Sequence, residues 1–128
     1  MVKTARGAFE VKLNPLKTAF EIEHLGRMSI DKSFKGELNG LSKGEMLSGL
    51  TTTKTSAGYV AIERFSGDLG GMKGSFILQH FGIMHAGENK LILEIIPNSG
   101  TEELSNIRGT MRIERNDKGH EYTLEYDI

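Results

Sequence analysis

Cysteine is absent from the 128 residues of this chain, and proline occurs only 2 times. Without cysteine, a disulfide framework, a thiolate nucleophile and a cysteine-ligated metal are all excluded. The absence of cysteine is compatible with the reducing cytoplasm, where we expect the protein to be located. No stretch approaches the ~20 apolar residues of a membrane span. The first residues, MVKTARGAFEVKLNP, contain no apolar run, so we also expect no signal peptide.

An excess of charge of either sign is also lacking. The chain has 16 Lys and Arg against 17 Asp and Glu, for a formal net charge of -1. Such a balance creates no strong field toward nucleic acid or an anionic membrane, so we expect neither as a partner. Charged residues make up 26 % and hydrophobic residues 38 %, which is typical of a folded protein, and the length fits a single domain spanning residues 1–128.

Glycine, in contrast, is abundant, with 16 residues, and it favours tight turns. Alternation of apolar and polar residues predicts about eight strands. Signals for hairpin turns include NG at 39–40, GG at 70–71, AGEN at 86–89 and NDKG at 116–119. Only 14–25 and 99–106 are compatible with a helical turn. Because a long meander removes its edges by closing, we predict an all-β, closed antiparallel eight-stranded barrel. The strands are expected at 8–13, 27–38, 45–51, 58–69, 72–85, 90–97, 107–115 and 120–127.

The stretch FSGDLGGMKGSF, residues 65–76, fixes one hairpin in detail. A two-residue turn at Gly70–Gly71 aligns the flanking strands and separates their side chains into two faces. Near the turn one face is polar, so the other should be the interior. The interior then receives Glu63 and His80 as diagonal neighbours. The similar stretch FKGELNGLSKGEM, residues 34–46, suggests a bulged turn, which leaves the orientation of Glu45 and Met46 open.

Glu63 and His80 are the candidate catalytic residues. A buried carboxylate is costly unless it is paired, and a histidine beside it can orient it for proton transfer. The same pair can equally be a structural ion pair that fixes the register. An apolar interior with a few polar groups is also the usual form of a small-ligand pocket. The ligand-binding residues that we predict are Tyr59, Ala61, Phe65, Phe76, Leu78 and Tyr122.

No other motif supports a cofactor or a metal. The spacing of His24, His80, His85 and His120 matches no metal-ligand pattern. The stretch GDLGGMKG lacks the Gly-x4-Gly-Lys-Ser/Thr pattern of a phosphate loop and lies between two predicted strands. The polar segment 97–109 is compatible with a lid, but we favour a helical turn capped by Ser99 or Thr101. The second face of the hairpin is too apolar for open water, so either residues 14–25 cover it or it is a subunit interface.

The motifs GEML, GYVAIERFSGDLGGMKGSFILQHFG, IIPNSGTEELSNIRGTMRI and HEYTLEYDI resemble a bacterial family catalogued as domain of unknown function 3224. The resemblance extends from about residue 34 to the end. It implies a barrel of the allene-oxide-cyclase type and a homo-oligomer. Met72 and the loop in FGIMHAGEN depart from the usual pattern. The family has no settled reaction, so the resemblance implies no catalytic residue.

Three functions follow as alternatives. The first is a barrel that binds a small, mainly apolar molecule in its interior. The second is an isomerase or cyclase that uses Glu63 and His80 for acid–base chemistry. The third is a filled structural barrel that acts through oligomerisation.

Overall fold

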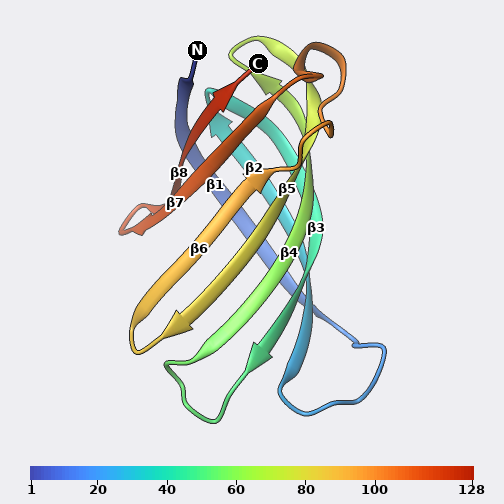
Figure 1. Cartoon of the computed structure of the whole chain (residues 1–128), viewed down its shortest axis with the longest axis vertical. Coiled ribbons are helices and arrows are strands. Elements are labelled where there is room, and N and C mark those ends of the chain that lie inside the picture. The colour runs from blue at the N-terminus through green and yellow to red at the C-terminus, as the bar shows by residue number, and fades with distance from the viewer.

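Eight antiparallel strands form a closed barrel in the computed structural model, which describes residues 1–128 (Figure 1). Each strand pairs with the next along the chain, and β8 returns to pair with β1. The all-β class and the eight-stranded barrel are thereby confirmed, while the allene-oxide-cyclase type stays a prediction. No helix of this fold has the length and apolar character needed to cross a membrane. The strands are β1 (Lys3–Leu16), β2 (Leu25–Gly36), β3 (Leu38–Leu50), β4 (Ala57–Leu69), β5 (Met72–His85), β6 (Glu88–Ile95), β7 (Arg108–Asn116) and β8 (Gly119–Asp127).

The β4–β5 hairpin has the predicted register. Gly70 and Gly71 form its turn with φ values of 58° and 91°, a left-handed conformation that favours glycine. Consequently Phe65 faces Phe76, and Ala61 faces His80. The alternation of side chains is also as predicted, because Glu63 and His80 are both buried inside the barrel.

The β2–β3 turn lies upstream of the predicted NG signal. Gly36, with φ of 111°, makes the turn, and the Asn39 side-chain amide donates a hydrogen bond of 2.6 Å back to the Gly36 carbonyl. The prediction of a turn at 39–40 was therefore wrong: Asn39 supports the turn from within β3. The pairing also settles an open orientation, since Met46 faces the interior and Glu45 faces outward, where it pairs with Arg27.

A cluster of buried side chains fills the end of the barrel that carries η1 and the β4–β5 turn, which is the upper end in Figure 1. There a 3-10 turn, η1 (Glu102–Leu104), follows β6 and buries Leu104 in the core. Thr101 precedes η1 but makes no side-chain cap bond, contrary to the predicted cap; its hydroxyl instead lies 2.6 Å from that of Ser75. The core cluster comprises Ala5, Phe9, Phe34, Leu38, Phe65, Leu69, Phe76, Leu78, Leu93, Ile95, Leu104, Ile107, Met111, Tyr122, Leu124 and Tyr126.

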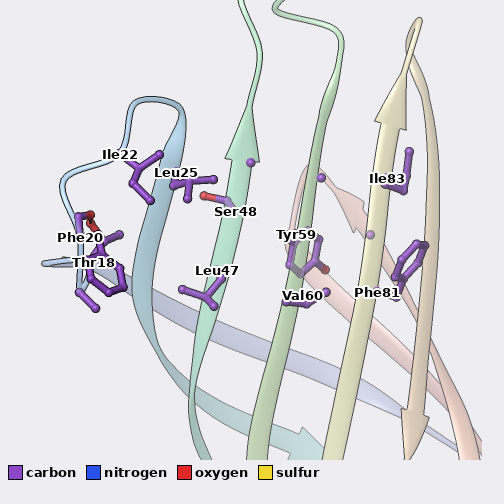
Figure 2. A pocket seen from close by; sticks show the side chains of 14 residues that line it. Thr18, Phe20, Ile22, Leu25, Leu47, Ser48, Tyr59, Val60, Phe81 and Ile83 are labelled. Atoms are coloured by element: carbon purple, nitrogen blue, oxygen red, sulfur yellow. Dashed lines mark hydrogen bonds between the residues drawn. The ribbon is translucent and has the colours of Figure 1, made fainter.

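Residues 17–24, between β1 and β2, form an extended loop with no helical turn. The start of the 14–25 segment continues β1, and the loop lies beside β2 at the lower end of the barrel (Figures 1 and 2). Phe20 remains 73 % exposed. The loop therefore borders the apolar outer face of the barrel without burying it.

Leu104 is expected to hold the closed end of the barrel together. Replacing Leu104 by Ala should lower the free energy of unfolding by about 2–5 kcal/mol, because it leaves a cavity in a filled core. Urea denaturation measures the change. Leu41→Ala is the control, since Leu41 is 54 % exposed on the outside. Equal effects of the two substitutions would contradict the role assigned to Leu104.

Candidate functional site

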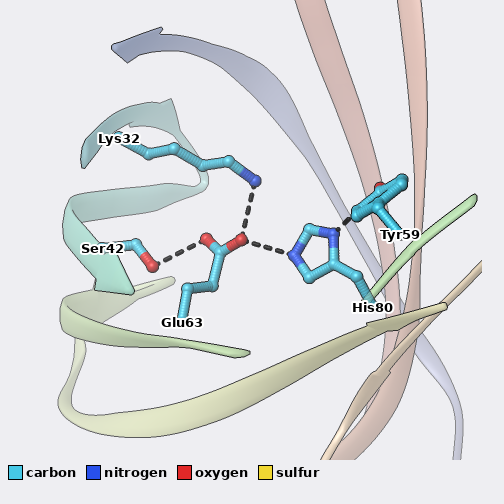
Figure 3. Close-up of polar contacts among 5 residues, drawn as sticks. All are labelled: Lys32, Ser42, Tyr59, Glu63 and His80. Carbon is cyan, nitrogen blue, oxygen red and sulfur yellow. Dashed lines mark hydrogen bonds and ion pairs between the residues drawn. The ribbon is translucent and has the colours of Figure 1, made fainter. Parts of the chain in front are cut away.

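A buried carboxylate, Glu63, is the centre of a hydrogen-bonded cluster inside the barrel (Figure 3). Its Oε2 atom lies 2.8 Å from Lys32 Nζ and 2.5 Å from His80 Nε2. Its Oε1 atom accepts a 2.7 Å hydrogen bond from the Ser42 hydroxyl. The four residues are between 0 % and 5 % exposed. No buried side-chain nitrogen or oxygen in the protein lacks a partner. The buried charges of the cluster are therefore paired and hydrogen-bonded, as their stability inside a protein requires.

Four neighbouring strands bring these side chains together. Lys32 comes from β2, Ser42 from β3, Glu63 from β4 and His80 from β5, all at inward positions of the alternation. Gly44 faces Glu63 across the β3–β4 ladder. A Cβ at Gly44 would lie 1.9 Å from the Ile62 carbonyl oxygen, so this close approach of the strands requires glycine.

Lys32 and Ser42 are the members that the sequence interpretation missed. The signal was present for Lys32, because alternation places it on the same face as Ile30 and Phe34. A lysine between two core positions indicates a buried counter-charge. In the structure the Lys32 ammonium also lies over the Phe9 ring, 4.9 Å from its centroid, which further stabilises the buried cation.

The electrostatics of the cluster favour an ionised Glu63. Burial alone raises the pKa of this carboxyl, but hydrogen bonding from His80 and the charge of Lys32 outweigh it and lower the pKa from 4.5 to about 2. An ionised Glu63 accepts hydrogen bonds only, so the Nε2 atom of His80 carries a proton and donates a hydrogen bond to Glu63. The other ring nitrogen, Nδ1, lies 3.4 Å from the Tyr59 hydroxyl.

Tyr59 connects this cluster to the open end of the barrel. Burial, and secondarily the negative charge of Glu63, raise the pKa of the Tyr59 phenol, so the hydroxyl stays protonated. It can then donate to Nδ1 of a neutral His80. Tyr59 also lines a cavity of about 350 Å³ at the lower end of the barrel, together with Met46, Ser48, Leu50, Ala57, Gly58, Gly82, Ile83, Met84, Asn89, Lys90 and Leu91.

The predicted ligand-binding residues therefore separate into two groups. Tyr59 lines the cavity, and Ala61 is buried beside His80 in the β4–β5 ladder. The remaining residues, Phe65, Phe76, Leu78 and Tyr122, belong to the filled core. The Tyr122 hydroxyl has a structural role there: it accepts a hydrogen bond from the Leu38 N–H, and its single proton lies within reach of the carbonyls of Lys35 and Leu38 at the β2–β3 turn. No three His, Asp or Glu side chains gather in an arrangement that could hold a metal ion.

Stability should fall in acid because of Glu63. Its pKa is lower in the folded protein than in the unfolded chain, so its contribution is complete above about pH 4.5 and is lost as the pH falls toward about 2. The difference between 4.5 and about 2 corresponds to about 3 kcal/mol. Urea denaturation at several pH values between 7 and about 2.5 should show this loss.

Glu63→Gln provides the comparison. It should unfold about 3–5 kcal/mol more easily at pH 7, because Lys32 loses its counter-charge. Its stability should also fall less steeply between pH 5 and 2.5. Glu10→Gln, at an exposed carboxylate on β1, should keep the wild-type pH dependence. A wild-type slope in Glu63→Gln would show that other carboxyls cause the acid sensitivity.

Comparisons with known proteins agree with this architecture. A search of the curated proteins finds no match. Among solved structures, the chain is similar to a protein with unknown function from the DUF3224 family of Shewanella oneidensis MR-1, with 46 % sequence identity and a TM-score of 0.95. The match covers 100 % of this chain and 98 % of the Shewanella chain. The family described as protein of unknown function (DUF3224) matches residues 5–126, and the chain thus belongs to the DUF3224 family.

Proposed function

We propose that the barrel binds a small, mainly apolar molecule through its open lower end, with the polar group of the molecule at Tyr59 and His80. One observation carries this proposal: an apolar cavity of about 350 Å³ shares Tyr59 with the buried Lys32–Glu63–His80 cluster. An apolar pocket with a few well-placed polar groups is the usual form of a small-ligand site. As for its location, we propose that the protein is cytoplasmic.

The balance of charge favours a neutral polar group on the ligand. Lys32 and Glu63 neutralise each other at 2.8 Å, so the cluster offers no unpaired charge to a carboxylate or an amine. What remains for a ligand is the Tyr59 hydroxyl and, through it, Nδ1 of His80. These groups suit a hydroxyl or carbonyl group, each of which can exchange a hydrogen bond with a phenol.

The alternative function is proton transfer of the isomerase or cyclase type. The direction of His80 favours it: one ring nitrogen is held by Glu63 and the other is aimed at Tyr59 beside the cavity. A carboxyl with a pKa of about 2 is a weak base, and Glu63 is fully buried. In this alternative His80 would therefore move the proton, with Tyr59 relaying it, and Glu63 would orient His80 rather than act as the acid or base.

The third alternative is a filled barrel, but the side chains fill the interior only at one end. The core cluster fills the closed end, whereas the cavity at the open end is about 350 Å³. A cluster that only fixed the strand register would not need to lie next to an opening, where Tyr59 and His80 can reach a ligand. We therefore rank this alternative below ligand binding.

Blocking the open end should abolish binding. Met46 faces inward and lines the cavity, so Met46→Trp fills part of it. Binding of Nile red, a neutral apolar dye, is followed by its fluorescence, and the variant should bind at least about tenfold more weakly. Lys43→Trp, outward-facing on the same strand, is the control and should bind as the wild type does. Unchanged binding in Met46→Trp would rule out the cavity as the site.

The polar group of the ligand is tested with three ten-carbon probes. Decanol should displace Nile red at a lower concentration than decanoate, and Tyr59→Phe should weaken decanol binding by about three- to tenfold because one hydrogen bond is lost. Binding of decane, which has no polar group, should not respond to this substitution. A preference for decanoate, or equal losses for decanol and decane in Tyr59→Phe, would contradict the assignment of Tyr59.

A further inference from the structure

A row of apolar side chains crosses the outside of the barrel. Leu47, Val60, Phe81 and Ile92 lie directly opposite one another on β3, β4, β5 and β6. Figure 2 shows the first three at a similar height on their strands. Their exposed fractions are 55 %, 50 %, 44 % and 43 %. We call these four residues the apolar row. Four adjacent strands that all expose a large apolar side chain at the same level indicate a surface with a partner.

The residues on either side of the apolar row are complementary to each other. On β6, the outward positions before and after Ile92 are Lys90 and Glu94, which have opposite charges. On β4, the positions before and after Val60 are Gly58 and Ile62, a residue without a side chain and a bulky one that is 52 % exposed. On each of these two strands, the residue before the apolar row therefore complements the residue after it. The pair on β6 is complementary in charge, and the pair on β4 is complementary in size.

We propose that this face binds a second copy of the chain, with the two-fold axis running along the apolar row. A two-fold axis in the interface inverts the strand direction, so each row residue meets its own copy. Lys90 of one copy then meets Glu94 of the other, and the reverse pair forms as well. Ile62 meets Gly58. On β5, Ile83 and Gln79 exchange in the same way, with Phe81 on the axis.

The surface has room for the partner's Ile62. A cavity of about 490 Å³ lies beside Gly58, with Leu47, Val60 and Phe81 on the barrel side. The loop of residues 17–24 supplies the opposite wall with Phe20 and Ile22 (Figure 2). A small apolar ligand would also find apolar walls here, but it would not use the opposite charges of Lys90 and Glu94. A second copy uses the charges and the hollow together.

The size of the surface sets the expected affinity. Three levels across four strands cover about 14 by 14 Å, from a strand spacing of about 4.8 Å and a two-residue rise of about 6.8 Å. With side chains at the margin and the 17–24 loop added, we expect the contact to bury about 600 Å² of surface on each partner. This area is at the lower end of the range for specific interfaces. We therefore expect a dimer that dissociates in the micromolar range rather than a permanent one.

Sedimentation velocity between about 1 and 500 µM tests the association, and a charge exchange tests its geometry. The wild type should change from monomer to dimer in this range. Lys90→Glu should raise the dissociation constant about three- to tenfold, because it places two negative charges opposite each other at both symmetric contacts. Adding Glu94→Lys to the same chain should restore dimerisation, because both ion pairs re-form in reverse. Lys118→Glu, an exposed charge at the β7–β8 turn, is the control and should have little effect.

A second measurement locates the axis. The chain has no cysteine, so a single introduced cysteine is cross-linked only where two copies meet. Val60→Cys, on the axis, should give a covalent dimer with a short bismaleimide, since packed sheets lie about 10 Å apart. Leu41→Cys, on the outer face of the same sheet and 54 % exposed, should not.

Each contrary result overturns the proposal. A chain that stays monomeric at about 500 µM has no such interface. A trimer, or a dimer that Lys90→Glu weakens without rescue by Glu94→Lys, has another geometry. A monomer in which Val60→Asp weakens Nile red binding would assign the face to a small apolar ligand. Circular dichroism and thermal unfolding of each variant verify folding, which is expected to persist because the substituted side chains are all exposed.

Discussion

The ionised carboxylate of Glu63 is the constraint on which the central part of this barrel depends. A charge with no exposed surface is stable only if partners surround it, and its partners here come from three other strands. The cluster thereby specifies the relative register of β2, β3, β4 and β5. A slip of one residue in β4 would turn Glu63 outward and leave Lys32 buried without a counter-charge. Alternative registers are therefore strongly disfavoured, beyond what apolar packing alone achieves.

The cluster also marks the boundary between two different interiors. On one side, aromatic and aliphatic side chains fill the barrel, and the 3-10 turn with Leu104 closes its end. On the other side, small or flexible residues such as Ser48 and Gly82 leave the cavity open. A charged cluster in the middle of the filled half would gain nothing from solvent or ligand. At the boundary it can orient His80 and Tyr59 toward the opening while its own charges remain compensated.

The sequence predicted the features that depend on local geometry. Gly70 and Gly71 specify one turn type, and counting from that turn places Glu63 and His80 inside with the correct neighbours. Alternation also predicts an inward position for Lys32, between Ile30 and Phe34, and the structure has it there. The NG signal at 39–40 predicts the wrong position for the β2–β3 turn, because Gly36 provides the left-handed conformation there.

Other features cannot be derived from a single strand or turn. Whether Phe65, Phe76, Leu78 and Tyr122 line a pocket or fill a core depends on how side chains from all the strands meet across the barrel. Alternation assigns them to the interior but does not say how much space remains. The position of the 14–25 segment could not be derived from alternation either. One of the two alternatives was that it covers the apolar outer face, but residues 17–24 form a loop at the border of that face. Packing between distant segments decides both cases.

Strand β4 combines the two unusual surfaces of the protein. Its inward residue Glu63 is charged and buried, whereas its outward residues Val60 and Ile62 are apolar and about half exposed. This is the reverse of the usual pattern, in which a strand buries apolar residues and exposes polar ones. Inside the barrel, the buried charge of Glu63 is compensated by its partners within the chain. Outside the barrel, no segment of the chain covers Val60 and Ile62. A second copy of the same surface would bury them without requiring any change inside the barrel.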